Sequence, residues 1–70
     1  MDSDEIRKLL ERNQPFTVHL ADGRKFSVPH RDFASVSPSR RTMTVYDDQG
    51  LTEILSMVLI SSLTVNEQAA

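Results

Sequence analysis

The chain has 70 residues, 39% of them hydrophobic, with a formal net charge of −2 and no cysteine. This length allows one small domain, which buries only about 60% of the surface of its extended chain and is therefore marginally stable. The absence of cysteine excludes a disulfide framework and a thiolate metal site. The longest apolar run, Met57 to Ile60, is too short for a bilayer, and the charged N-terminal stretch lacks a signal-peptide core, so we expect a cytoplasmic protein.

A short helix is predicted at the beginning of the chain, where Asp2 or Ser3 can cap it. Its apolar side chains fall on one stripe at helical spacing: Ile6, Leu9 and Leu10. Asn13-Gln14-Pro15 ends the helix, because a proline disfavours a helical residue before it. A helix of about ten residues is unstable alone in water, so we expect its stripe to cover one opening of a β-sheet.

The stretch FTVHLADGRKFSVPHRDF, residues 16–33, is typical of a β-hairpin. Apolar and polar residues alternate through residues 16–20 and again through 25–28, and Asp22-Gly23 between them supplies a tight turn. Pro29 then stops the pairing of strands. Residues 33–36 fit either a short strand or a single helical turn.

The second half of the chain predicts three more strands. Residues 41–46 and 51–56 flank a turn at Asp47-Asp48-Gln49-Gly50. The alternation breaks at Met57-Val58-Leu59 and resumes over residues 60–65, and a one-turn 3₁₀ element would account for the break. We expect residues 1–66 to form a single domain and residues 67–70 to be a frayed tail.

The predicted fold class is mainly β, a small α+β domain in which a helix precedes about five antiparallel strands. A strongly bent sheet of this size tends to close into a small barrel. The order of elements resembles the SH3-like barrels, and with its leading helix it resembles the Sm-like variety in particular. The stretch PFTVHLADGRKFSVPHRDFA and the ending ILSMVLISSLTV also resemble a group of short, uncharacterised bacterial proteins, and this resemblance implies no activity.

Charge is unevenly distributed, with +3 over residues 13–46 and −4 over residues 47–70. This is either a mixed, solvated surface or a dipolar molecule that packs head to tail or presents one basic edge. The candidate contacts for a nucleic acid or another partner are Arg24, Lys25, Arg31, Arg40, Arg41 and Tyr46. Tyr46 is the one plausible platform for base stacking.

The Sm resemblance implies RNA binding through these basic loops, and this is our alternative hypothesis. The sequence departs from the Sm pattern at two motifs. HRDFASV stands where the first Sm motif has an Asp…Asn pair, and Met57-Val58-Leu59 replaces the Arg-Gly of the second. The acidity of the chain also opposes phosphate binding.

No catalytic, cofactor or metal residues are predicted, and we do not expect an enzyme. The chain has no GxSxG, no glycine-rich phosphate loop and no HExxH. Asp32 is expected to cap a turn beside His30, although the two residues could form half of a metal or acid–base site. His19 is expected to be an exposed or half-exposed strand residue, and Asp47-Asp48 a solvated hairpin tip.

The main hypothesis is a non-enzymatic interaction module that is a homo-oligomer and has an unidentified protein as a further candidate partner. A small core without disulfides favours oligomerisation, and an unpaired strand edge can pair with its copy in another subunit. Leu51, Ile54, Leu55 and Met57 are too many for a single inward face. The excess therefore lies under the helix or in a subunit interface.

Overall fold

The predicted helix opens the fold in the computed structural model, which describes residues 1–66. The expected frayed tail, residues 67–70, lies outside the described residues. Helix α1 spans Ser3–Glu11, and the Asp2 carboxylate caps it by accepting the N–H of Asp4 at 3.0 Å. Ile6 and Leu9 are buried, as the apolar stripe predicts, and Leu10 is partly buried.

Helix α1 ends directly before Asn13-Gln14-Pro15, as predicted, and Asn13 supplies the capping conformation. Asn13 has a φ of 53°, in the left-handed region. The N–H of Asn13 donates to the carbonyl of Leu10 at 3.0 Å, and the N–H of Gln14 donates to that of Leu9 at 2.9 Å. This pair of bonds is a Schellman motif, in which asparagine is a common substitute for glycine. The helix therefore ends through its own capping geometry, and Pro15 lies beyond it.

The predicted hairpin is confirmed as strands β1 (Phe16–Leu20) and β2 (Lys25–Val28). In the turn, the N–H of Gly23 donates to the carbonyl of Leu20 at 3.0 Å, and Gly23 has a φ of 93°. A glycine in this conformation closes a three-residue hairpin loop without steric cost. Alternate residues of β1 are buried, which is the pattern expected of a strand with one face on the core.

Of the two alternatives for residues 33–36, the structure realises the short strand, and a 3₁₀ turn comes directly before it. A 3₁₀ turn, η1, spans Arg31–Phe33, and strand β3 spans Ala34–Val36. The turn redirects the chain after Pro29, whose missing N–H cannot continue the ladder of β2. The additional short strand brings the number of strands to six, against the expected five.

The remaining elements follow the predicted order. Strand β4 (Thr42–Tyr46) pairs antiparallel with β5 (Thr52–Ser56) across a turn in which Gly50 has a φ of 87°. The break in alternation is the 3₁₀ turn η2 (Met57–Leu59), which confirms that prediction, and β6 (Ile60–Val65) follows it.

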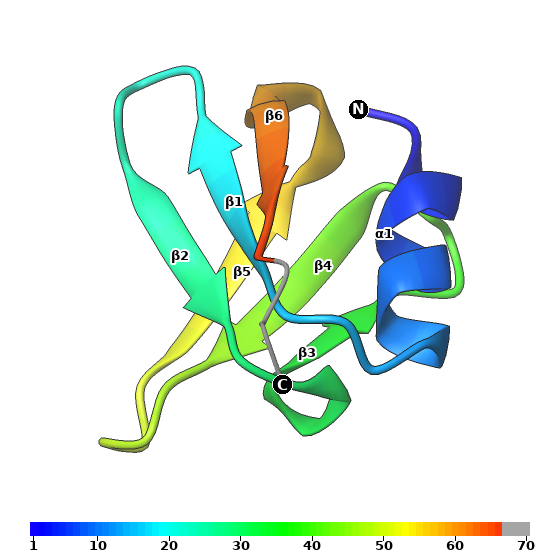
Figure 1. Ribbon diagram of the computed structural model, residues 1–70. Coiled ribbons are helices and arrows are strands. Elements are labelled where there is room, and N and C mark those ends of the chain that lie inside the picture. The colour runs from blue at the N-terminus through cyan, green and yellow to red at the C-terminus, as the bar shows by residue number, and fades with distance from the viewer. Residues whose placement is uncertain (67–70) are drawn as a thin grey trace.

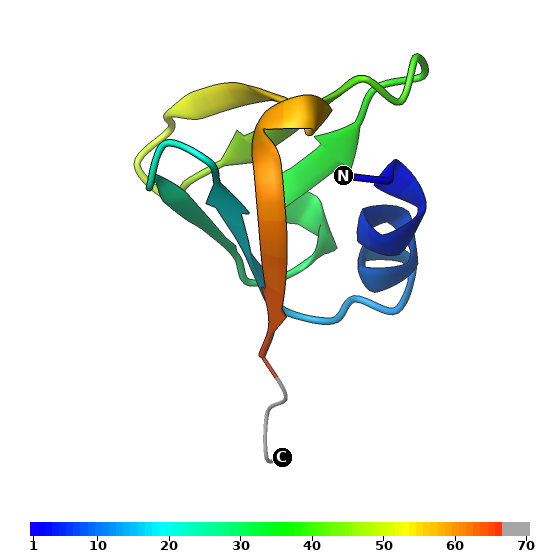
Figure 2. The same ribbon diagram turned by 90° about the horizontal axis from the view of Figure 1, so that it is seen from above.

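The six antiparallel strands form two three-stranded sheets, in the orders β2-β1-β6 and β3-β4-β5. Figures 1 and 2 show α1 on the side of the molecule away from β2, next to β3. Among residues 1–66, no strand of one sheet pairs with a strand of the other, so the predicted closed barrel is not confirmed. The small α+β class is confirmed.

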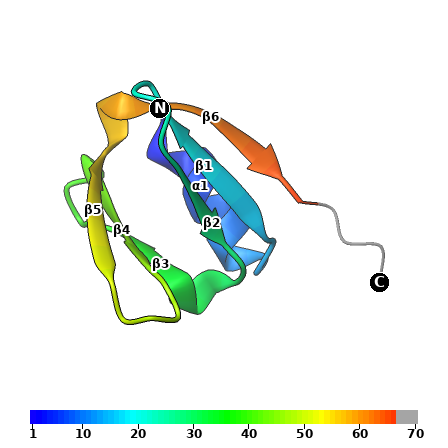
Figure 3. The ribbon, with the colours of Figure 1, turned by 90° about the vertical axis from the view of Figure 1, so that its left-hand side faces the viewer.

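The core lies between the two sheets and α1. Its largest fully buried side chains come from the helix and from three strands: Phe16, Ile6, Met43, Val18 and Val28. The segment before the helix is held to the beginning of η2 because the main-chain nitrogen of Met1 donates to the carbonyl of Met57 at 3.1 Å. Figure 3 shows β5 and β6 at opposite margins of the molecule, each at the end of its own sheet.

Candidate interaction surface

The five predicted basic contacts do not form one patch. Arg24 and Lys25 lie at the β1–β2 turn, Arg31 begins η1, and Arg40 and Arg41 lie in the loop between β3 and β4. Figure 1 shows these three segments at different ends of the molecule. The structure therefore does not bring the predicted cations together.

Two of these arginines face acidic side chains. The Nε of Arg24 lies 2.9 Å from Oδ2 of Asp22, and Nη1 of Arg40 lies 3.5 Å from Oδ1 of Asp4. Both pairs are about half exposed, so each contributes little to stability. The main-chain N–H of Arg24 also donates to Asp22 at 3.0 Å, and this hydrogen bond lowers the pKa of the Asp22 carboxyl below its ordinary value.

Tyr46, the predicted stacking platform, lies at the end of β4 among acidic residues. It borders two adjoining hollows of about 240 and 260 Å³ that separate β2 from the β4–β5 turn. The acidic side chains lining these hollows are Asp47, Asp48 and Glu53. Lys25, another predicted contact, lines the second hollow together with Tyr46. Three carboxylates outnumber this one cation and repel phosphate, so the surroundings of Tyr46 do not favour a nucleic acid.

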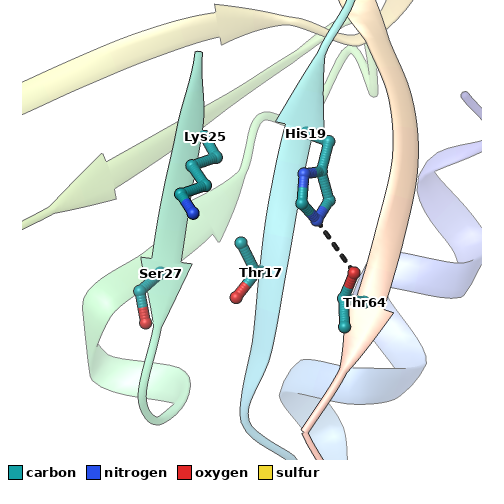
Figure 4. A pocket seen from close by; sticks show the side chains of 5 residues that line it. All are labelled: Thr17, His19, Lys25, Ser27 and Thr64. Atoms are coloured by element: carbon teal, nitrogen blue, oxygen red, sulfur yellow. Dashed lines mark hydrogen bonds between the residues drawn. The ribbon is translucent and has the colours of Figure 1, made fainter. Parts of the chain in front are cut away.

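The outer face of the β2-β1-β6 sheet carries a polar hollow of about 460 Å³, which Figure 4 shows from close by. Its lining residues are Thr17, His19, Lys25, Ser27 and Thr64. His19 is half-buried, within the expected range, and its Nε2 lies 2.8 Å from Oγ1 of Thr64. None of the lining residues is an acid that could orient the imidazole, so the pair lacks the third member of a nucleophile–base–acid set.

His30 and Asp32 lie side by side, with Nδ1 of His30 3.8 Å from Oδ2 of Asp32, and the His30 side chain is partly exposed and that of Asp32 largely exposed. The expectation that Asp32 caps the turn is wrong: Nδ1 of His30 accepts the N–H of Asp32 at 3.4 Å, and His30 is the N-cap of η1. The His30 ring also packs edge-on against Phe33, with 4.5 Å between ring centroids. Within residues 1–66, no cluster of three or more His, Asp or Glu side chains could hold a metal ion.

The outer edge of β5 carries main-chain groups that face away from the sheet. In an antiparallel pair, every second residue exchanges hydrogen bonds with its partner strand. The N–H of Asp47 donates to the carbonyl of Leu51 at 3.1 Å, and the N–H of Met57 donates to that of Arg41 at 2.8 Å. The register between these two pairs is unbroken. The odd-numbered residues of β5 therefore bond to β4, and the even-numbered residues face outward: Thr52, Ile54 and Ser56.

Large apolar side chains are exposed along the same segment. Leu51 is 64% exposed, Ile54 70% and Val58 84%, and Leu59 is also exposed. Of the four residues that appeared too many for one inward face, Leu55 and Met57 are buried and Leu51 and Ile54 are not. The excess does not lie under the helix. Val58 and Leu59 are not among the predicted contacts, and the break in alternation at residues 57–59 is the signal that points to them.

We call the exposed side chains of Leu51, Ile54, Val58 and Leu59, with the outward main-chain groups of β5, the β5 surface. Its edge carries no lysine, proline or bulge, and Glu53 is the one charged side chain on β5. The edge strand β2 differs, because it begins with Lys25 and is followed by Pro29. The edge strand β3 is packed beside α1.

Comparisons of the chain with models of protein families, with curated proteins and with solved structures gave no match. Among residues 1–66, none of the helices has the length and apolar character that crossing a bilayer requires.

Proposed function

We propose that this protein is a non-enzymatic interaction module that self-associates through the β5 surface. The observation that supports this proposal is the coincidence of outward main-chain groups on the edge strand β5 with exposed apolar side chains on that strand and on both sides of it, Ile54 on β5, Leu51 before it and Val58 after it. An unpaired strand edge is a template for pairing with another chain. Exposed aliphatic side chains beside that edge add a hydrophobic gain when the edge is covered.

The expected gain is comparable in size with the cost of association. Complete burial of one isoleucine or leucine side chain stabilises by about 1.5–3 kcal/mol, and each new main-chain hydrogen bond by about 0.5–1.5 kcal/mol. These gains oppose an association cost of about 4–15 kcal/mol. Self-association therefore requires that several apolar side chains and the ladder of main-chain hydrogen bonds are covered together.

Sedimentation velocity across protein concentrations tests this proposal, together with the variant Ile54→Lys. We expect the wild-type protein to form a larger species as its concentration rises, and Ile54→Lys to remain a monomer. Val65→Lys is the matched control, because Val65 is also an exposed β-branched residue on an edge strand and lies on β6. A wild-type protein that stays monomeric at high micromolar concentration contradicts self-association.

We also propose that the two sheets are an open form of the SH3-like or Sm-like barrel. The order of a helix, several antiparallel strands and a 3₁₀ turn before the last strand supports this. An experimental structure in which β1 pairs with β2 and β6 while β4 pairs with β3 and β5, with the sheets packed at a steep angle, is the expected result.

The alternative function is binding of single-stranded RNA through the basic loops. In its favour, Arg31 and Arg41 are exposed and make no ion pair with any residue of the described part of the chain. Fluorescence anisotropy with a labelled RNA pool should then show binding that weakens with salt and with Arg31→Ala or Arg40→Ala. The absence of any binding at low ionic strength would remove this alternative.

A further inference from the structure

We infer that two copies of the chain pair β5 with β5 about a two-fold axis at Ile54, so that two three-stranded sheets become one continuous sheet of six strands. The inference rests on the proposed self-association and adds its symmetry and register. An isologous contact places the same strand of both copies side by side, and a two-fold axis perpendicular to the strands makes them antiparallel.

The outward groups of β5 restrict the register. An axis at Ile54 makes Ile54 face Ile54 of the second copy, and Thr52 face Ser56 of the second copy. All three outward residues of each strand then exchange main-chain hydrogen bonds, because each outward residue faces another outward residue. An axis at Thr52 or Ser56 would leave part of this edge facing a turn or η2.

Charge excludes another choice of axis. An axis at Glu53 would place the Glu53 carboxylates of the two copies directly opposite each other, and such like-charge pairs are destabilising. An axis at Leu55 would place Thr52 opposite Val58, which belongs to η2 and has left the strand. With the axis at Ile54, Glu53 faces Leu55 of the second copy, and the two carboxylates are diagonal neighbours instead.

The same register uses the exposed apolar side chains. The two Ile54 side chains become direct neighbours on the outer face of the joined sheet, beside Thr44, the residue opposite Ile54 on β4. Leu51 falls opposite Met57 of the second copy, at the beginning of η2, where Val58 is exposed. Three of the four apolar side chains of the β5 surface therefore lie along the contact.

Disulfide cross-linking tests the register, because the wild-type chain contains no cysteine and a single introduced thiol is unique. In Ile54→Cys, the two introduced residues would have Cα atoms about 5.5 Å apart, which is within the range of a disulfide. We expect mild oxidation to yield a covalent dimer. Ser61→Cys, on β6, is the control for random collision, and Ile54→Cys should give about tenfold more dimer, because pairing raises the effective thiol concentration.

A second pair of variants keeps Ile54 and tests the register independently. Thr52→Cys mixed with Ser56→Cys should form a mixed disulfide, because these residues face each other across the axis. Thr52→Cys alone should not cross-link, since its two copies lie four residues apart along the strands, about 13 Å, which exceeds the reach of a disulfide. Circular dichroism confirms that each variant is folded.

The outcomes separate this inference from the proposed function. Self-association with cross-linking through Ser61→Cys, or growth beyond a dimer, would overturn the two-fold pairing and leave self-association in place. Wild-type protein that remains a monomer, with no specific cross-linking of any variant, would overturn both. Association with the Ile54→Cys and Thr52/Ser56 cross-links supports both.

Discussion

The two hairpins of this protein use the same turn chemistry but meet different surroundings. Gly23 and Gly50 both have a positive φ, and in each turn an aspartate accepts a main-chain N–H two residues later. Strand β1 of the first hairpin lies between two strands and buries every second side chain. Strand β5 of the second lies at an edge and buries Leu55 alone. Local sequence forms both hairpins, and packing decides which of them has an open surface.

The largest expected effect contrasts a buried residue of β1 with an exposed one of β5. Phe16 is fully buried, so Phe16→Ala should lower the free energy of unfolding by about 3–5 kcal/mol. Ile54 is 70% exposed, so Ile54→Ala should change the stability of the monomer by less than about 0.5 kcal/mol. Urea unfolding at low protein concentration measures both. A large loss for Ile54→Ala in the monomer would show that Ile54 belongs to the core.

The next largest expected effect is the loss of stability when the glycine of either turn is replaced, and it tests whether the two turns are equivalent. Each glycine has open space where a Cβ would lie, so the cost of alanine is the cost of the backbone conformation. Gly23→Ala and Gly50→Ala should each lower stability by about 1–2 kcal/mol. Asparagine tolerates a positive φ better, so Gly23→Asn and Gly50→Asn are the controls and should cost less. Unequal losses at the two sites would mean that tertiary contacts hold one turn independently of its glycine.

Much of the fold is predictable because its signals are local. The alternation of β1 and β2 around Asp22-Gly23 predicts the first hairpin, and the break at residues 57–59 predicts η2. The capping role of His30 was not predictable, because a histidine is an unusual N-cap and its geometry depends on the turn after Pro29. Whether two sheets join is a non-local property, set by the path of the chain between β2 and β3.

The candidate site was predictable only in part, because it also depends on contacts between segments that are far apart in the sequence. The sequence indicates that the segment around Leu51 and Ile54 has more apolar side chains than one inward face can bury. Whether the remaining side chains pack under the helix or lie on the surface depends on where α1 packs. The basic residues appear clustered in the sequence and are separated in space, because η1 and β3 carry the chain around the domain between them.

A smaller effect is expected on the strength of self-association when the charge of Glu53 is removed, and it tests the contact at β5. In the inferred pairing, the two Glu53 residues are diagonal neighbours whose Cα atoms are about 7–8 Å apart. Repulsion between their carboxylates therefore weakens the dimer modestly. Glu53→Gln should therefore tighten self-association by about twofold to fivefold at low salt, and this gain should shrink at high salt. Asp48→Gln, in the β4–β5 turn, is the control for general charge. Sedimentation equilibrium at two ionic strengths provides the measurement.

The smallest expected effect is a change in the pKa of Asp22 in the turn of the first hairpin. The hydrogen bond from the main-chain N–H of Arg24 lowers the pKa of Asp22 in the folded protein. A lowered folded-state pKa means that the stabilising contribution is fully present above the unfolded pKa, about 3.9, and is lost as pH falls through the folded value. NMR titration should place the midpoint of Asp22 below the ordinary value of an aspartate. Arg24→Ala keeps the main-chain donor, so most of the lowering should persist, whereas Arg24→Pro removes the N–H and should abolish it. A midpoint that returns to its ordinary value in Arg24→Ala would assign the effect to the guanidinium instead.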